Sequence, residues 1–138
     1  MTHVKLTNLF DLDRARNGLL FGAEVRSLVI EALVDTGAMS LVLPAEVVEA
    51  LGLPIARTQG VRLADGTRRD LPVVAGVMIE ILGRTMSCDA IVTPAGSTPL
   101  IGQIPLEGLD LVVTPGTREV GPNPANPDGP VYELLRAS

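Results

Sequence analysis

The chain has 138 residues, of which 46% are hydrophobic and three are aromatic, with 14 glycines and 11 prolines; this composition suits one domain and favours β structure over helix. Its net charge is −5 and its Lys and Arg residues are scattered, which excludes a basic footprint for nucleic acid. No apolar run reaches the roughly 18 residues of a membrane span and no signal peptide is visible, so we expect a cytoplasmic protein with neither membrane nor nucleic acid as partner.

The N-terminal third is expected to hold two strands and a helix. Residues 4–10 predict a first strand, and the polar, turn-rich residues 11–22 predict a loop. Residues 24–34 form a β-branched run that is apolar on both faces, which predicts a buried strand ending at Asp35. The clearest helix is expected at residues 44–51, because proline suits its first turn and a glycine follows as its stop.

Two hairpins are expected in the middle of the chain. The dipeptide Asp65-Gly66 is a turn signal between strands at residues 61–63 and 71–74. A second hairpin is expected around Gly83, between residues 77–81 and 86–92.

The C-terminal part is expected to be more irregular. A short turn or helix at residues 104–108 precedes a strand at residues 109–114. The proline-rich residues 121–130 indicate an extended linker, and residues 131–135 indicate a final strand.

Few side chains are available for chemistry. The sole histidine, His3, lies near a terminus, and the lone Cys88 is expected to be a small core residue. One His and one Cys cannot form a zinc site, and no glycine-rich loop precedes a helix in the phosphate-binding arrangement. We therefore expect no metal and no cofactor, and any catalysis must use carboxylates.

Asp35 stands out among the carboxylates by its context. An apolar strand delivers it, and Thr36 and Gly37 follow directly. Gly37 would let the chain turn sharply and bring its N–H close to the carboxylate, and Thr36 can donate a hydrogen bond across an interface. Taken alone the tripeptide is a weak signal, since an Asp can simply open a turn.

A longer pattern resembles the retropepsin-like aspartic proteases. Leu33-Val34-Asp35-Thr36-Gly37-Ala38 is similar to the active-site motif of that family. Pro99-Leu100-Ile101-Gly102 is similar to its second signature, which packs behind the active-site loop. Ala64-Asp65-Gly66-Thr67 stands where the family carries its mobile flap. The resemblance covers about residues 25–114 and is nearest to bacterial and retrotransposon members.

The resemblance implies a fold and a set of site residues. It implies a mainly β, single-lobe acid-protease β-barrel with one or two short helices, assembled as a C2 homodimer. Residues 1–138 would form one domain with its core at about residues 25–114. The catalytic residues would be Asp35, Thr36 and Gly37, and Gly102 would be structural. The residues expected to bind substrate are Ala38, Met39, Ala64, Asp65, Gly66, Leu100 and Ile101.

The chemistry of such an enzyme needs two chains. Peptide hydrolysis by this route uses two carboxylates about 3 Å apart that share one proton, because like charges that close cannot both ionise. The ionised carboxylate takes a proton from the attacking water, and the protonated one polarises the scissile carbonyl. A chain with one Asp-Thr-Gly supplies both only as a homodimer with two copies of Asp35 on its axis.

Two positions depart from the retroviral pattern. Retroviral members usually carry an Asp after the Asp-Thr-Gly-Ala stretch and an Arg after the Ile-Gly, and these two form an ion pair. Here the positions hold Met39 and Gln103, so no unpaired buried charge remains and that end of the cleft becomes more apolar. The expected flap lacks a glycine cluster and carries charges instead, which fits either a stiffer flap or a solvated hairpin face.

Three functions are compatible with these observations. The first is an aspartic endopeptidase that acts on a peptide or protein substrate as a homodimer, with terminal strands of the two chains interleaved. The second is a catalytically silent dimeric β-barrel module that binds peptides or mediates assembly. The third is a processing enzyme that trims one partner or itself, with residues 11–22 as a candidate cleavage region. The intact Asp35-Thr36-Gly37 favours the first, because a binding module has no need of such a carboxylate.

Overall fold

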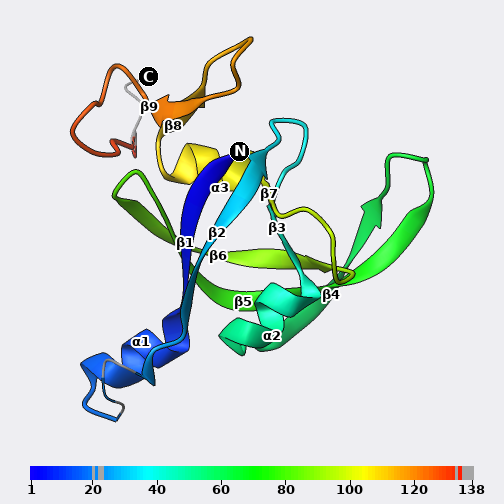
Figure 1. Cartoon of the computed structure of the whole chain (residues 1–138), viewed down its shortest axis with the longest axis vertical. Helices are drawn as coiled ribbons and strands as arrows, with labels where there is room; N and C mark the ends of the chain where they lie inside the picture. Colours follow the sequence, from blue (N-terminus) through cyan, green and yellow to red (C-terminus); the bar gives the residue numbers. More distant parts are fainter. Residues whose placement is uncertain (20, 22–23, 133, 135–138) are drawn as a thin grey trace.

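The computed structural model describes residues 1–19, 21, 24–132 and 134, and it is mainly β (Figure 1). Its elements in chain order are β1 (Thr2–Asn8), α1 (Leu9–Arg16), β2 (Ser27–Val34), β3 (Leu41–Pro44), α2 (Ala45–Leu51), β4 (Ile55–Arg62), β5 (Arg68–Ile81), β6 (Arg84–Thr93), β7 (Leu100–Ile101), α3 (Gln103–Gly108), β8 (Leu111–Val113) and β9 (Val120–Pro122).

Seven of the strands form one mixed sheet in the order β1-β2-β7-β3-β6-β5-β4. β1 also pairs with β5, so the strands from β1 to β5 in that order form a closed cycle of hydrogen-bonded neighbours. β2 runs parallel to β7, which sets the C-terminal ends of these two strands side by side. β8 and β9 form a separate two-stranded sheet beside α3 (Figure 1).

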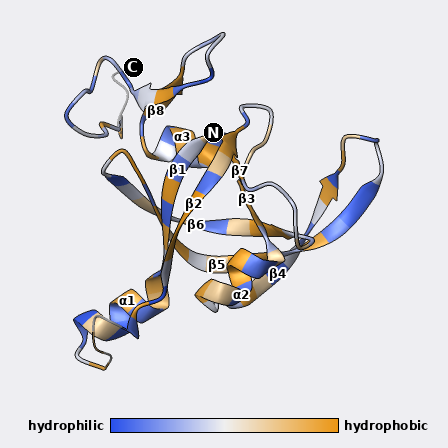
Figure 2. Cartoon of the chain, viewed as in Figure 1, coloured by the Kyte–Doolittle hydropathy of each residue, from blue (hydrophilic) through white to orange (hydrophobic). Residues whose placement is uncertain are grey.

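The core is aliphatic, in keeping with a chain that has only three aromatic residues. Val, Leu, Ile and Ala side chains from both the strands and the helices make up the buried cluster. Figure 2 shows hydrophobic residues along the same strands and helices. The largest fully buried members of the cluster include Leu6, Leu41, Leu43, Leu51, Ile79, Ile81, Ile101 and Leu109. Among the described residues, no helix has both the length and the apolar character needed to cross a membrane.

The loop predicted for residues 11–22 is wrong over its first half, because α1 continues to Arg16. The side chain of Asn8 caps this helix by accepting a hydrogen bond from the Asp11 N–H at 3.0 Å. Asp11 lies in the first turn and two arginines lie in the last, and both placements favour the helix dipole. Residues 20, 22 and 23 of the predicted loop lie outside the described residues.

The strand predicted for residues 24–34 exists, but it begins at Ser27 and is not buried on both faces. Its residues alternate in exposure, and Val29 is 69% exposed. Ala32 and Val34 face the core, so the strand buries one face and that burial becomes complete only near Asp35.

Both predicted hairpins are confirmed, with longer strands than expected. The two strands predicted at residues 71–74 and 77–81 are one strand, β5, whose register shifts between Val74 and Val77. Gly76 lies at this bulge with a left-handed backbone, and the ring of Phe10 occupies the space beside it. The helix at α2 is also confirmed, although Pro44 is its N-cap, and β3 had no sequence signal of its own.

The extended linker predicted at residues 121–130 is wrong. The segment begins within β9 and then turns back onto the same chain, where Asp110 holds it. The Asp110 carboxylate accepts hydrogen bonds from the side chains of Asn123 (3.0 Å) and Asn126 (2.7 Å) and from the Val131 N–H (3.2 Å). These bonds, led by the one from Asn123, lower the pKa of Asp110.

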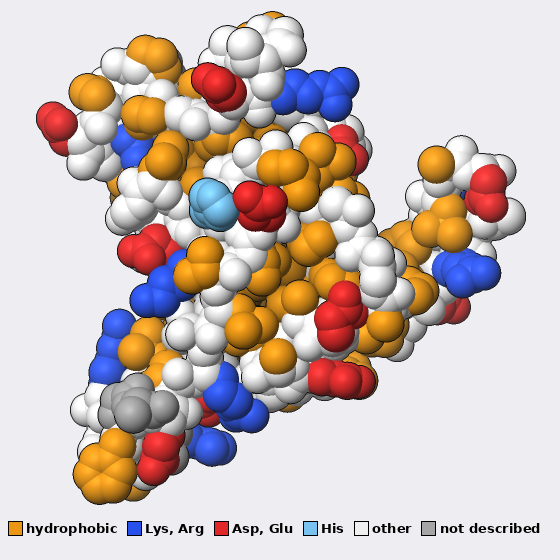
Figure 3. Space-filling view, viewed as in Figure 1, with side chains coloured by type: hydrophobic (Ala, Val, Ile, Leu, Met, Phe, Trp, Pro, Cys, Tyr) orange, Lys and Arg blue, Asp and Glu red, His pale blue; other side chains and the backbone are white. Residues whose placement is uncertain are grey.

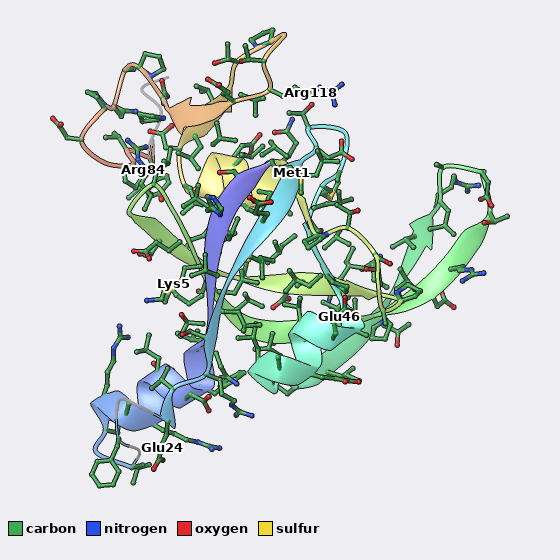
Figure 4. The ribbon with its side chains drawn as sticks, viewed as in Figure 1. Met1, Lys5, Glu24, Glu46, Arg84 and Arg118 are labelled. Carbon is green, nitrogen blue, oxygen red and sulfur yellow. The ribbon has the colours of Figure 1, made fainter. Side chains whose placement is uncertain are left out.

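Two further side chains, Arg84 and Tyr132, help to attach the C-terminal segment. The buried Arg84 donates to the carbonyls of Leu109, Asp110 and Asn126, and its place beneath this segment can be followed in Figure 4. The Tyr132 hydroxyl donates to the Gly108 carbonyl. The final strand predicted at residues 131–135 is absent at 131, 132 and 134, while 133 and 135 lie outside the described residues.

Candidate active site

Asp35 is the first residue after β2, and the parallel pairing with β7 fixes its position. The pairing matches Leu33 with Leu100 and Val34 with Ile101. One residue further on, the Asp35 N–H donates to the Ile101 carbonyl at 3.0 Å. Main-chain hydrogen bonds therefore hold the half-buried Asp35 from below, at the end of two adjacent strands.

The loop after Asp35 turns back onto its carboxylate. The Gly37 N–H donates to Asp35 Oδ1 at 2.9 Å, and the Ala38 N–H donates to the Asp35 carbonyl at 3.1 Å. A Cβ on Gly37 would lie 3.2 Å from Asp35 Oδ1. Gly37 does not adopt a left-handed conformation, so the value of glycine here is close approach to the carboxylate. Thr36 and Gly37 are exposed.

Gly102 lies directly behind this loop. Its N–H donates to the Ser40 carbonyl at 3.1 Å. A Cβ at this position would lie 2.5 Å from the Ser40 oxygen and 2.6 Å from the Ala38 oxygen, and both are backbone atoms that the loop holds in place. Only glycine fits without displacing the loop.

The N-terminus of α3 completes the support. The Gln103 N–H donates to the Ala38 carbonyl at 2.9 Å, and the Ile104 N–H donates to the Met39 carbonyl at 2.8 Å. The first amides of a helix have no partner within the helix, and here the loop supplies it. The two positions that depart from the retroviral pattern, Met39 and Gln103, thus lie on adjacent segments, and Met39 is 72% exposed.

A cavity of about 240 Å³ opens at Asp35. Its walls are Leu33, Val34, Asp35, Thr36, Val113 and Arg118, and Figure 4 shows Arg118 on the β8–β9 hairpin above the loop that follows β2. Among these residues Asp35 is the only acid and Arg118 the only base. No local sequence signal points to Val113 or Arg118, because the fold of the β8–β9 hairpin brings them here.

A second cavity, of about 420 Å³, lies between the base of the β4–β5 hairpin and the loop of residues 35–40, called here the candidate active-site loop. Met39 and Ser40 line it together with β4 residues, the floor includes Val73 and Ala90, and Ile104 closes one side. Arg57 Nη2 and Asp89 Oδ2 lie 3.9 Å apart at this cavity. The sequence analysis missed these β4 residues, because residues 57–61 show no alternation of apolar and polar side chains that would predict a strand.

The tip of the hairpin lies apart from Asp35. Ala64, Asp65 and Gly66 are exposed. In the described part of the chain, they border neither of the two cavities above. Asp65 accepts hydrogen bonds from the Thr67 hydroxyl (2.6 Å) and N–H (2.9 Å), which lower its pKa. The hairpin, at the right of Figure 1, projects away from the body of the molecule.

The remaining expected contact residues differ in accessibility. Leu100 is half-buried beside Leu33, whereas Ile101 is fully buried in the core. In this chain the Ile101 side chain therefore faces the core, and Leu100 is the member of the pair nearer the surface.

Cys88 lies outside this site. Burial raises the pKa of its thiol to about 12, with the Asp89 carboxylate adding to the effect. A thiol in this state is a poor nucleophile. Among the described residues, no group of three or more His, Cys, Asp or Glu side chains is arranged to hold a metal ion.

The family model described as aspartyl protease matches residues 21–121. The chain therefore belongs to the aspartyl protease family, of the retropepsin-like clan. A search of the curated proteins found no match.

Proposed function

We propose that the protein is an aspartic endopeptidase that acts as a homodimer, with one Asp35-Thr36-Gly37 from each chain. The observation that carries this proposal is the single carboxylate at the cavity beside β2, on a loop supported from behind by Gly102 and α3. Membership of the aspartyl protease family supports peptide hydrolysis as the reaction. The likeness to bacterial and retrotransposon members, and a cytoplasmic location, remain parts of this proposal.

The chemistry requires a second carboxylate, and one chain does not supply it. Asp35 is the only acid among the residues that line its cavity. In the described part of the chain its carboxylate accepts one hydrogen bond, from Gly37. Two copies of Asp35 across a two-fold axis would share one proton. The ionised copy would activate water, and the protonated copy would polarise the peptide carbonyl.

The expected interleaving of terminal strands has limited room in this chain. β1 pairs with β2 along residues 2–7 and with β5 along residues 5–8, so residues 5–7 are occupied on both edges and residues 2–4 keep one edge free. The C-terminal segment is attached to its own chain through Asp110. The β8–β9 sheet pairs with no other strand of the described chain and lies next to the Asp35 cavity. Its unpaired edges make it the candidate contact between two copies, which would bring two Asp35 carboxylates to one site.

Asp35→Asn tests the proposal. The variant is expected to lose peptidase activity by about a thousandfold or more, while its mass in solution stays that of the wild-type protein. Activity is measured on a mixed peptide library from acidic to neutral pH, and mass by light scattering. Asp13→Asn on α1 is the matched control, because it removes the same charge from an exposed site. Full activity in Asp35→Asn would eliminate the assignment, and peptide binding without cleavage by the wild type would favour the silent module.

A further inference from the structure

The β4–β5 hairpin carries several arginines in an acidic protein. It holds four of the eleven Lys and Arg residues of a chain whose net charge is −5. Figure 3 shows charged side chains of both signs on this projecting hairpin. What these arginines can bind depends on which face of the hairpin each one occupies.

The strand register assigns the faces. Residues directly opposite each other in an antiparallel pair point to the same side of the sheet, and neighbours along a strand point to opposite sides. One face holds the pairs Arg57 with Val73, Gln59 with Leu71 and Val61 with Arg69. The other holds Thr58 with Pro72, Gly60 with Asp70 and Arg62 with Arg68.

The cavity beside the candidate active-site loop shows which face is turned to the cleft. The side chains of Arg57, Gln59, Val61 and Val73 line that cavity together with Met39, and Gly60, which has no side chain, also borders it. The four hairpin side chains belong to the first face, which Arg69 extends toward the tip of the hairpin.

Arg68 lies on the opposite, outer face. Its guanidinium stands 2.8 Å from the place where a Cβ on Gly60 would be, and Gly60 belongs to the outer face. Its Nη2 also lies 3.8 Å from Asp70 Oδ1, on the same face. Two adjacent arginines, Arg68 and Arg69, are thus separated by the thickness of the hairpin.

Arg69 is the uncompensated cation of the cleft face. Arg57 has Asp89 within 3.9 Å, and Arg68 has Asp70. Within the described chain no carboxylate lies within 4 Å of Arg69. Asp70, which follows Arg69 on β5, faces outward. Its carboxylate therefore does not compete with a ligand that approaches Arg69 from the cleft side.

We propose that Arg69 is a specificity-determining residue that gives this protein a preference for peptides carrying Asp or Glu beneath the hairpin. The inference rests on the proposed function and on the expected role of the β4–β5 hairpin as a flap over an extended peptide. Because successive side chains of an extended peptide point to opposite sides, the preference should fall on alternate peptide positions. An exposed ion pair of this kind is worth about a two- to fivefold preference for Glu over Gln.

The test compares charge reversal on the two faces. Peptides differing only by Glu or Gln at one position are assayed with wild type, Arg69→Glu and Arg68→Glu. The two variants have the same net charge and alter adjacent residues, so any general electrostatic effect is common to both. Arg69→Glu is expected to abolish or invert the Glu preference, Arg68→Glu should keep it, and the preference should shrink as salt rises.

The outcomes separate this inference from the proposed function. Binding of the same peptides is also measured by fluorescence anisotropy in the Asp35→Asn background, where cleavage plays no part. The role of Arg69 would be overturned if the two variants changed peptide selection equally. It would also be overturned if the protein with both arginines intact showed no preference for Glu over Gln. The other outcome is Glu-selective binding that depends on Arg69, with no cleavage by the wild type. That result would refute the peptidase assignment and would still support Arg69 as a binding residue.

Discussion

Asp11 and Asp35 both follow closely on a strand near the N-terminus, yet their surroundings differ in kind. Asp11 is 3% exposed, and its two oxygens accept bonds from Arg26 Nε at 2.7 Å and Nη2 at 3.0 Å. The Arg26 N–H adds a third bond at 3.1 Å. Asp35 is half-buried at the mouth of a cavity, and in the described chain its carboxylate accepts from Gly37 alone.

The difference teaches where each region obtains its rigidity. Around Asp11 the carboxylate itself joins α1 to the start of β2, and Arg26 also packs against Gly52 at the end of α2. Around Asp35 the backbone is held by β7, Gly102 and α3, and the carboxylate does little of the holding. A structural carboxylate is satisfied within its chain, whereas Asp35 keeps acceptor capacity for a second chain, water or substrate.

Gly102→Ala is expected to produce the largest effect on stability, because it attacks the backbone support of Asp35. The new methyl group would meet the fixed carbonyls of Ser40 and Ala38. We expect a loss of about 3 kcal/mol in the free energy of unfolding, with peptidase activity per folded molecule also reduced. Urea unfolding followed by circular dichroism measures the change.

A matched control separates that clash from the general cost of replacing a glycine. Gly129→Ala adds the same methyl group where nothing lies within 4 Å and the backbone is not left-handed. It should change stability by less than about 0.5 kcal/mol. Similar losses in the two variants would refute the view that Gly102 is required by close contact with the loop.

Asp11→Asn and Asp35→Asn should have opposite effects on stability and activity. Asp11→Asn is expected to cost about 2 kcal/mol, because it weakens charge-assisted bonds to Arg26 while leaving the arginine in place. Asp35→Asn should change stability by less than about 0.5 kcal/mol and remove activity. Thermal unfolding and peptidase assays on both variants check this, and equal destabilisation by the two would contradict the comparison.

Acid should reveal the same contrast as a smaller, graded effect. Arg26 holds the pKa of Asp11 below its usual range, so the unfolded chain takes up the proton first as pH falls. The stabilisation is present above the unfolded value of about 3.9 and is lost as pH falls through the lower, folded pKa. Urea midpoints from pH 6 to pH 2 should therefore fall less steeply in Asp11→Asn than in the wild type. An unchanged slope would contradict a depressed pKa at Asp11.

Local sequence signals predicted the elements that are bounded by clear turn or helix-cap residues. Asp65-Gly66 and Gly83 mark turns that close as hairpins, and Gly52 ends α2 in a left-handed conformation. α1 was missed although its N-cap was readable, because Asn8 was assigned to the first strand and Asp11 to the loop after it. β3 was missed because a four-residue apolar run has no periodicity that distinguishes it from its surroundings.

The sequence by itself determined a mainly β chain with an aliphatic core, and it predicted an aspartyl protease motif at Asp35, since composition, turn residues and short motifs are local properties. Only the tertiary structure decided that Arg118 and Val113 border Asp35, that Asp110 attaches the C-terminal segment, and that Arg69 rather than Arg68 shares the cleft face. The physical reason is that register and packing join residues far apart in the chain, and a shift of one residue reverses the face that a strand residue occupies.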